Sequence, residues 1–406
     1  MCGIVGIISN KDISCLETKV KKMNVLQKHR GLDGEGYWCS DKKNVHLAHR
    51  RLSIIDLSSA GHQPMVSKDN LYTIVFNGEI YNYKELKEKC IKRGSKFYSN
   101  TDTEVIIEYI KHFGVQGIKD LRGMWAFVLY DIRENKVIFS RDPFGIKPLH
   151  YAIYEDCIYF ASEIKSLRLI DDYFNKIDEV TKQIFLDFGY LDIGQWTFFK
   201  HIKRFPQASY AEVDLNRIVK IEFVQYWQPP KQLMNIDEKK AVEELHVLLK
   251  QSIKRHMVSD VPVAFCLSGG LDSSIIIGIA ATIAENKEKL NSFTAHHPNF
   301  PEIDEVKWAQ LAVNHLNVNP HWIEVEYKDF VEEVDLVLYH HDEPFGSTSI
   351  YAQNTIFKAI NKAGLKTNLR SEERPKNICC DWLPTDISQR GHKCSLIHCT
   401  NNAVLV

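Results

Sequence analysis

The chain lacks an excess of charge of either sign, a long apolar run and any low-complexity segment. Its 51 Lys and Arg residues against 52 Asp and Glu residues leave a net charge of −1, so no global field attracts it to nucleic acid or anionic lipid. The apolar stretch 275–284 is about half as long as the roughly 20 residues that cross a bilayer. No cationic segment precedes the apolar start of the chain, which argues against a secretory signal. We therefore expect a cytoplasmic protein without a nucleic-acid or membrane partner.

The ten cysteines follow no regular spacing, which argues against a disulfide framework and indicates reduced thiols. With 44% hydrophobic residues in 406, the chain can build large cores, and its length suggests two or three domains. Four of the ten cysteines lie unusually late in the sequence, within the last 28 residues. These are Cys379, Cys380, Cys394 and Cys399.

The first 210 residues or so are rich in short strand patterns with helical patterns between them. This mixture predicts an α+β domain built on layered sheets. Strands are expected at 3–8, 71–76, 124–130, 136–140 and 157–161, and helices at 17–27, 83–93 and 103–113.

A different rhythm begins after Pro229-Pro230, which cannot continue a helix or a central strand and therefore favours a linker. Strands and helices then alternate, the pattern of an α/β doubly wound parallel sheet. Helices are expected at 237–256, from 272 and at 304–316, with strands at 261–267, 292–295 and 321–325.

Cys2 lies next to the start of the chain, before the small Gly3. Removal of Met1 would give Cys2 a free α-amine, with an ordinary pKa of about 8, beside its own thiol. Such an amine can act as the base that activates the nucleophile in N-terminal-nucleophile enzymes. Taken alone, Cys2 fits a buried small hydrophobic residue equally well.

Five motifs follow Cys2 in order, rich in His, Arg, Asn, Asp and Gly. They are His29-Arg30-Gly31, His49 to Asp56, Asn77 to Asn82, Thr101 to Glu104 and Arg141 to Gly145. Together with Cys2 they closely resemble the glutaminase domain of class II glutamine amidotransferases over residues 2–210. The resemblance implies an N-terminal-nucleophile sandwich of α/β/β/α layers. Leu32 departs from the family, which usually has Pro there.

The resemblance implies that Arg51 binds the α-carboxylate of glutamine through a bidentate pair. Glu79 and Asp102 would accept hydrogen bonds from the α-ammonium. The alternative for Arg51 alone is a solvated surface charge, a role for which Arg50 is the better candidate.

The implied catalytic residues are Cys2, Asn77 and Gly78. The Asn77 amide and the Gly78 N–H would bind glutamine and stabilise the oxyanion that forms when the thiolate attacks. Glycine at 78 would also let the backbone approach the reacting carbon. Asn77-Gly78 alone fits a hairpin turn as well.

A loop of glycines and serines, Ser268-Gly269-Gly270-Leu271-Asp272-Ser273-Ser274, separates an apolar strand from a helix. Hydroxyl groups and free N–H groups at a helix N-terminus form a cradle for pyrophosphate. The loop lacks the Gly-Lys-Ser/Thr ending of a Walker A motif and resembles the PP-loop of ATP pyrophosphatases. A Ser/Gly helix cap without a ligand is the alternative.

The PP-loop resemblance implies ATP as substrate, with Leu267 and Ala295 bordering the adenine. Asp272 would help to hold Mg²⁺, which prefers carboxylate and phosphate oxygens. The cluster at 341–344, His-Asp-Glu-Pro, fits either a contact to magnesium or substrate or a solvated loop.

A glutaminase domain followed by a PP-loop domain is the arrangement of glutamine-dependent asparagine synthetases. Membership implies that ammonia from glutamine displaces AMP from adenylated aspartate, giving asparagine, AMP, pyrophosphate and glutamate. It also makes a homodimer possible. Two alternatives stay open: amidation of another carboxylate acceptor, and a truncated chain with glutaminase activity only.

The family pattern is expected to stop after about Lys366, where neither the family's apolar strand nor its Ser-Gly-x-Gly-x-Asp-Glu loop is recognisable. A shifted reading frame or truncation is the simplest interpretation. We therefore predict a glutaminase domain at 2–210, a linker at 211–236, a partial, C-terminally incomplete ATP-binding domain at 237–366 and an atypical tail at 367–406. Zinc binding in the tail is a weaker alternative, because the spacing lacks a Cys-x-x-Cys pair. Its ligands would be His392 and His398 with the four late cysteines.

Overall fold

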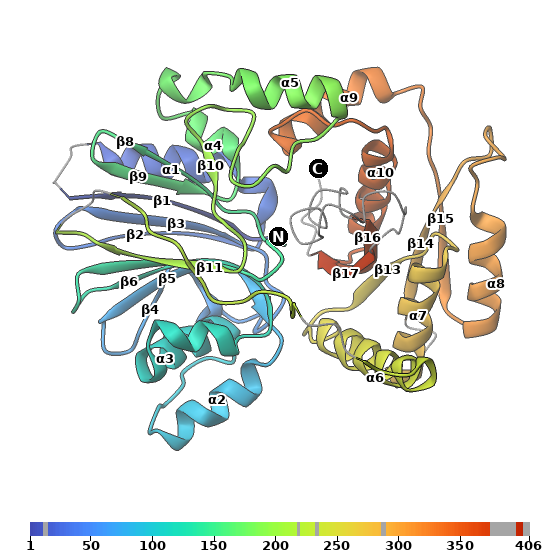
Figure 1. Cartoon of the computed structure of the whole chain (residues 1–406), viewed down its shortest axis with the longest axis horizontal. Helices are drawn as coiled ribbons and strands as arrows, with labels where there is room; N and C mark the ends of the chain where they lie inside the picture. The colour runs from blue at the N-terminus through green and yellow to red at the C-terminus, as the bar shows by residue number, and fades with distance from the viewer. Residues whose placement is uncertain (11–14, 217–219, 232–234, 286–289, 374–394, 401–406) are drawn as a thin grey trace. The chain divides into compact units, whose positions relative to one another are not determined.

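The computed structural model describes residues 1–10, 15–216, 220–231, 235–285, 290–373 and 395–400, the last group and 371–373 by their backbone alone. The chain divides into two compact units, Met1–Pro229 and Pro230–Val406 (Figure 1).

The first unit contains two six-stranded antiparallel sheets, with strand orders β10-β8-β9-β1-β3-β2 and β12-β11-β7-β6-β5-β4. The predicted strands and helices of this part are all present, with ends shifted by a few residues. The strands are β1 (Gly3–Ser9), β2 (Gly34–Cys39), β3 (Val45–Arg51), β4 (Met65–Val66), β5 (Tyr72–Ile80), β6 (Gly123–Asp131), β7 (Lys136–Arg141), β8 (His150–Tyr154), β9 (Cys157–Ala161), β10 (Lys203–Arg204), β11 (Ser209–Asp214) and β12 (Val224–Gln225). The helices are α1 (Leu16–Leu26), α2 (Tyr83–Lys92), α3 (Asp102–Phe113), α4 (Ile164–Arg168) and α5 (Glu179–Phe188).

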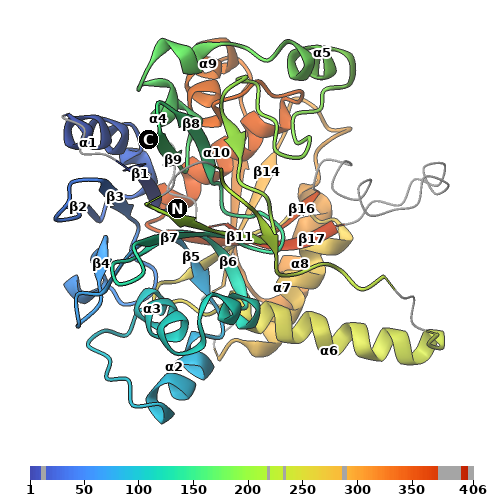
Figure 2. The ribbon, with the colours of Figure 1, turned by 60° about the vertical axis from the view of Figure 1, so that its left-hand side comes forward.

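Helices cover the outer faces of both sheets, which confirms the predicted α/β/β/α layers. Figure 1 and Figure 2 show α1 and α4 on one side of the strands and α2 and α3 on the other.

The position of β1 in the fold explains why its sequence is apolar at almost every position. Ile4 and Ile8 point into the core between the sheets, whereas Val5 and Ile7 pack in the core beneath the helices. Both faces of β1 are therefore buried.

The first unit extends past residue 210, the end expected from the sequence, because the chain continues as a strand. β11 pairs along its whole length with β7. Further on, the Tyr226 hydroxyl donates to the Arg141 carbonyl oxygen at 2.7 Å, and the Tyr226 ring stacks on Trp125. Much of the expected linker 211–236 therefore belongs to the first unit.

The second unit is built on a five-stranded sheet of order β15-β14-β13-β16-β17. The first four strands are parallel, as predicted, and β17 is antiparallel to β16. Helix α10 packs on one face through its contact with β14, and Figure 1 shows α7 and α8 on the other. The strands are β13 (Val263–Cys266), β14 (Asn291–His296), β15 (Asn319–Glu324), β16 (Thr367–Glu373) and β17 (Ser395–Thr400), and the helices are α6 (Glu238–His256), α7 (Leu271–Ile283), α8 (Val306–Leu316), α9 (Phe330–His341) and α10 (Ser349–Lys362).

The strand order creates a crevice at one defined place. From β13 the chain winds outward to β14 and β15, then returns through α10 to β16 on the opposite side of β13. In open parallel sheets, ligands bind at such a reversal, beyond the carboxyl ends of the strands. The carboxyl ends of β13, β14 and β16 therefore frame the expected site.

The prediction that no strand follows Lys366 was wrong. Thr367–Glu373 forms β16, which pairs in parallel with β13, so Leu369 lies opposite Phe265. The apolar pattern failed because polar residues occupy this interior strand: Thr367, Asn368 and Arg370 are buried.

Little can be said of the rest of the predicted tail. Residues 374–394 and 401–406 lie outside the described residues, and with them three of the late cysteines and His392, named above as zinc ligands. His398 and Cys399 fall in β17, whose side chains are not described.

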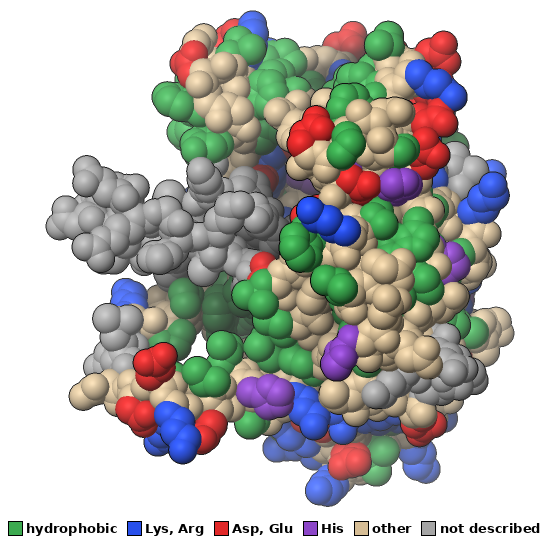
Figure 3. All heavy atoms as spheres, turned by 90° about the vertical axis from the view of Figure 1, so that its right-hand side faces the viewer, with side chains coloured by type: hydrophobic (Ala, Val, Ile, Leu, Met, Phe, Trp, Pro, Cys, Tyr) green, Lys and Arg blue, Asp and Glu red, His purple; other side chains and the backbone are tan. Residues whose placement is uncertain are grey.

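No helix in the described part of the chain is long and apolar enough to cross a membrane. On the face of the second unit seen in Figure 3, hydrophobic side chains are interleaved with charged and histidine side chains. Trp308 and Leu311 of α8 are among the exposed apolar residues of this unit.

Candidate functional site

Cys2 lies immediately before β1 and is held against the end of β3. The β1–β3 register places Gly3 opposite Arg50, which brings Cys2 beside the residues that follow. The Leu52 N–H donates to the Cys2 sulfur at 3.3 Å, and the same sulfur lies 3.6 Å from the Leu52 carbonyl oxygen. The peptide group of Leu52 therefore fixes the position of the thiol.

Burial raises the pKa of the Cys2 thiol, because a thiolate loses hydration there. The N-terminal ammonium, the Leu52 N–H and the charges of Lys147 and Arg51 act in the opposite direction and favour the thiolate. Burial also lowers the pKa of the Met1 α-amine, and the charge of Arg30 lowers it further. The amine at the start of the chain therefore holds its proton weakly.

A buried cluster of charges holds the Cys2 main chain. Arg30 Nε donates to the Cys2 carbonyl oxygen at 2.9 Å, and Arg30 Nη1 donates to Glu163 Oε1 at 2.9 Å. His29 Nε2 and Lys165 Nζ also contact the Glu163 carboxylate, at 2.8 and 2.7 Å. Burial alone would raise the pKa of Glu163, but these cationic neighbours hold it well below its usual range.

Asn77 and Gly78 lie in β5, inside the second sheet. Asn77 is 1% exposed, and its Nδ2 group has no hydrogen-bond partner among the described residues. A buried amide donor without a partner is unusual and fits a group that donates to a bound molecule. A Cβ atom at Gly78 would lie 2.8 Å from Trp125 Cα. Only glycine therefore fits this close approach of β5 to β6.

Glu79 and Asp102 form a pair of buried carboxylates. Asp102 begins α3, and its Oδ2 accepts a hydrogen bond from the Ile80 N–H at 2.9 Å. Burial, together with the negative charge of Glu79, raises the pKa of Asp102 to about 7. Two buried carboxylates that disfavour each other's ionisation provide a suitable environment for one ammonium group.

Arg51 ends β3, with its guanidinium enclosed by the loop that follows. It donates through Nη1 to the Ser58 carbonyl oxygen at 2.7 Å and through Nη2 to the Asp56 carbonyl oxygen. Arg51 is therefore not a freely solvated charge. The expectation that Arg50 is a surface charge was wrong, because Arg50 is 7% exposed and its Nε donates to the Asn24 carbonyl oxygen. It lies on the face of β3 that packs toward α1.

The sequence patterns missed several residues at this site. Glu163 belongs to no motif that we recognised, and Leu52 contributes only backbone groups. Asp142, from the fifth motif, is completely buried and accepts hydrogen bonds from four backbone N–H groups, including that of Lys147. It therefore shapes the loop that carries Lys147, whose charge acts on Cys2.

The glycine-serine loop of the second unit joins β13 to α7. Ser268 Oγ and Ser273 Oγ lie 3.0 Å apart, and the Gly270 N–H donates to Ser268 Oγ at 3.3 Å. Gly269 has φ +76°, and a Cβ atom there would lie 2.6 Å from Trp308 Cβ and 2.7 Å from the Ala309 nitrogen. The loop is therefore a tight turn pressed against α8, with hydroxyl groups at the start of α7.

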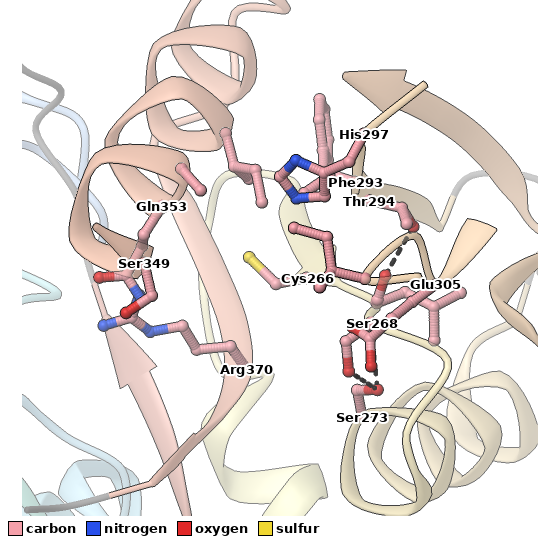
Figure 4. A pocket seen from close by; sticks show the side chains of 15 residues that line it. Cys266, Ser268, Ser273, Phe293, Thr294, His297, Glu305, Ser349, Gln353 and Arg370 are labelled. Carbon is pink, nitrogen blue, oxygen red and sulfur yellow. Dashed lines mark hydrogen bonds between the residues drawn. The ribbon is translucent and has the colours of Figure 1, made fainter. Parts of the chain in front are cut away.

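A pocket of about 210 Å³ lies at the strand-order reversal, next to this loop (Figure 4). Of the predicted nucleotide-binding residues, four line it: Leu267, Ser268, Ser273 and Ala295. The other five, Gly269, Gly270, Leu271, Asp272 and Ser274, belong to the loop and the first turn of α7 but not to the pocket wall.

Later parts of the chain complete the pocket wall. Arg370 from β16 and Gln353 from α10 face it on one side, with His297 on the other (Figure 4). These three residues could not be predicted from the sequence, because they lie outside any motif. The cluster at 341–344 contributes no lining residue. Within the described residues, no group of three or more His, Cys, Asp or Glu side chains could hold a metal ion.

Comparison with known proteins assigns both units to described families. Residues 1–227 match the glutamine amidotransferase domain, and residues 244–372 match asparagine synthase. The second match continues past Lys366, through most of β16.

Three curated proteins resemble the chain over most of its length. It is 34% identical to asparagine synthetase [glutamine-hydrolyzing] 1 of Bacillus subtilis, over 89% of this chain and 56% of that protein. It is 34% identical to a putative asparagine synthetase [glutamine-hydrolyzing] 2 of Methanocaldococcus jannaschii, over 86% of this chain and 70% of that protein. It is 32% identical to asparagine synthetase B of Escherichia coli, over 92% and 63%. The chain thus spans between 56% and 70% of the length of these relatives.

Proposed function

The chain belongs to the family of glutamine-hydrolysing asparagine synthetases, and we propose that it releases ammonia from glutamine at Cys2 and uses it to amidate aspartate with ATP. One observation carries the proposal most directly. The Cys2 thiol is held by the Leu52 peptide next to Arg51, in the unit that also carries the buried Asn77, Glu79 and Asp102. Arg51 suits the α-carboxylate of glutamine, the two acidic residues suit its α-ammonium, and Cys2 and Asn77 suit its side-chain amide.

Glutamine would bind through both ends of its amino-acid group. Arg51 offers a guanidinium whose orientation is fixed by two backbone carbonyl oxygens, and this suits a carboxylate. Glu79 and Asp102 would accept hydrogen bonds from the α-ammonium. Because that ammonium brings a positive charge, its binding would lower the pKa of Asp102 and ionise the pair.

The proposed reaction starts when the Cys2 thiolate attacks the side-chain carbonyl carbon of glutamine. The thiol proton passes to the α-amine, which becomes that of Cys2 once Met1 is removed, and from there to the leaving nitrogen. The C–N bond breaks, ammonia leaves, and a glutamyl thioester remains. Water then cleaves the thioester to give glutamate. The Asn77 Nδ2 group and the Gly78 N–H would stabilise the oxyanion in both steps.

The second unit would bind ATP with its phosphates at the glycine-serine loop. The hydroxyl groups of Ser268 and Ser273 and the N-terminus of α7 suit phosphate oxygens. Asp272 is exposed in the first turn of α7 and forms no ion pair within the described chain. Its free carboxylate fits Mg²⁺ held mainly by phosphates, and bound Mg²⁺ would neutralise phosphate charge. The side-chain carboxylate of aspartate would attack the α-phosphorus of ATP and release pyrophosphate. Ammonia would then attack the resulting aspartyl adenylate and displace AMP.

Two further features belong to the proposal. We propose that the reaction takes place in the cytoplasm, because it would use ATP and a reduced thiol. A homodimer stays a prediction.

Glutamate release from glutamine tests the first half of the proposal. Cys2→Ala should abolish it, because no other group replaces the nucleophile. Cys39→Ala is a matched control, since Cys39 is a free, partly exposed thiol of the same unit that lies in β2. Glutaminase activity that survives in Cys2→Ala would overturn the assignment.

A second candidate function is glutamine hydrolysis without synthesis. It is favoured by the sequence of β16, which reads Arg370-Ser371-Glu372-Glu373 where the family has its Ser-Gly-x-Gly-x-Asp-Glu loop. Exchange of labelled pyrophosphate into ATP, measured with aspartate present, separates the two candidates. Exchange supports synthesis, and its absence alongside glutamate release supports the glutaminase alone.

A further inference from the structure

The pocket of the second unit has different chemistry at its two ends. Ser268 and Ser273 lie at the end formed by the glycine-serine loop, and His297 lies at the other end (Figure 4). Apolar side chains, including Phe293 and Ile356, also line the pocket. A nucleotide combines the same properties: charged phosphates and a flat base with apolar faces and a polar edge.

His297 is buried at this end of the pocket. Its side chain points into the pocket (Figure 4), although the residue is only 9% exposed. The ring lies nearly parallel to that of Tyr327, with centroids 6.0 Å apart. The His297 carbonyl oxygen accepts a hydrogen bond from the Phe300 N–H at 2.9 Å, which holds the backbone of this residue. The imidazole is therefore presented to the pocket and largely shielded from solvent.

One polar atom of this imidazole is not used by the described part of the protein. His297 Nδ1 is buried and has no hydrogen-bond partner among the described residues. Burial lowers the pKa of His297, with Asp304 opposing the shift, so the ring is neutral at pH 7. A neutral imidazole has one donor and one acceptor nitrogen, and buried polar groups are rarely left without partners. The absence of a partner within the protein points to a ligand.

We propose that His297 is a specificity-determining residue that hydrogen-bonds the polar edge of the nucleotide base. This inference rests on the proposed binding of ATP to the second unit. Adenine presents an acceptor at N1 beside an amino donor at position 6, whereas hypoxanthine presents a donor and an acceptor in the reverse order. A buried imidazole nitrogen that pairs with one pattern disfavours the other, because the mismatched base requires the other imidazole tautomer or leaves a polar group unpaired.

Calorimetric titration of the whole chain with ATP, AMP, IMP and inorganic pyrophosphate tests the inference. His297→Leu should weaken ATP and AMP binding about fivefold to tenfold, the size of one neutral hydrogen bond. Pyrophosphate, which has no base, should bind as before. His297→Gln retains a donor and an acceptor and should restore part of the loss. His296→Leu is the matched control, because His296 pairs with Asp304 and does not line the pocket.

Each outcome decides the question. Equal affinity of the unsubstituted chain for AMP and IMP, or unchanged ATP affinity in His297→Leu, would overturn the role of His297 while leaving ATP binding intact. Equal losses of ATP and pyrophosphate affinity in both His297 variants would also overturn it, because a structural defect explains them. Failure of the unsubstituted chain to bind either ATP or pyrophosphate would remove the proposed ATP site, and the inference with it.

Discussion

Arg30 joins the Cys2 main chain to the buried carboxylate of Glu163, with both hydrogen bonds at 2.9 Å. The guanidinium uses Nε for the Cys2 carbonyl oxygen and Nη1 for Glu163, so it spans the two groups in one plane. Once Met1 is removed, as the proposed mechanism requires, only one peptide bond would hold Cys2. Arg30 would supply a second constraint on its main chain, and Glu163 fixes Arg30.

Arg30→Lys should lower kcat for glutamate release about tenfold and leave the KM for glutamine nearly unchanged. Lysine retains the positive charge beside Glu163 but cannot bind both groups, so Cys2 loses orientation rather than substrate affinity. Steady-state kinetics of glutamate release measures both constants.

Arg50→Lys is the matched control for this substitution. Arg50 is also buried, and its Nε also donates to a backbone carbonyl oxygen, that of Asn24. An equal fall of kcat in both variants would mean that loss of any buried arginine disturbs the unit, and the orienting role of Arg30 would be lost.

In the chain without bound glutamine, Asp102 should lower the free energy of unfolding as the pH rises from about 4 to about 7. Its pKa is about 7 in the folded chain against an ordinary value of 3.8, so the folded state binds more protons in this range. The stability that Asp102 contributes is fully present below pH 4 and is lost as the pH rises through 7. Urea unfolding at pH 5 and pH 8 measures the change, and Asp102→Asn should reduce it.

Asp69 provides a control of opposite sign. Burial would raise the pKa of Asp69, but hydrogen bonds from Lys111, Ser67 and the Leu71 N–H, together with the charge of Lys111, lower it to about 2. Its contribution is present above pH 4 and disappears only in acid. Asp69→Asn should therefore leave the loss between pH 5 and pH 8 unchanged. If Asp102→Asn also leaves the loss of stability between pH 5 and pH 8 unchanged, Asp102 does not titrate near pH 7.

Gly78→Ala should abolish glutaminase activity and destabilise the first unit by about 1–3 kcal/mol, as expected for overpacking. The added methyl group would lie 2.8 Å from Trp125 Cα, and the β5 backbone must move to admit it. Gly34→Ala is the control, because its nearest neighbour would be Arg51 Cβ at 3.8 Å. Chemical unfolding and glutamate release should both remain nearly normal in Gly34→Ala.

Much of the fold could be predicted because its signals are local. Alternating apolar residues, glycine turns and the change of rhythm after Pro229 identify the strands, the helices and the two units. The motifs of the first unit were recognisable for the same reason, since each is a short contiguous segment. Glu163 could not be found in this way. Its role depends on contacts with residues more than 130 positions away.

The misassigned segments share a different cause. Arg50 and β16 both place charged or polar side chains in the interior, where pattern-based reasoning expects apolar ones. Arg370 is 7% exposed in β16, an interior strand of the second unit's sheet, and lines the pocket. Such residues violate the hydrophobic pattern where they face a site or a buried partner. The sequence alone does not distinguish that situation from a solvated segment.

Gly269→Ala should weaken the binding of both ATP and pyrophosphate at least tenfold, and Gly364→Ala should not. Both glycines have φ +76°, so alanine suffers the same backbone strain at either position. Only at Gly269 would the new Cβ also meet α8, 2.6 Å from Trp308 Cβ, whereas at Gly364 nothing lies within 4 Å. Comparison of the two variants therefore separates the effect of backbone strain from the effect of the contact with α8. Calorimetric titration with pyrophosphate measures the effect on the phosphate end of the pocket. Equal losses in both variants would show that the left-handed conformation, and not the packing of the loop against α8, governs phosphate binding.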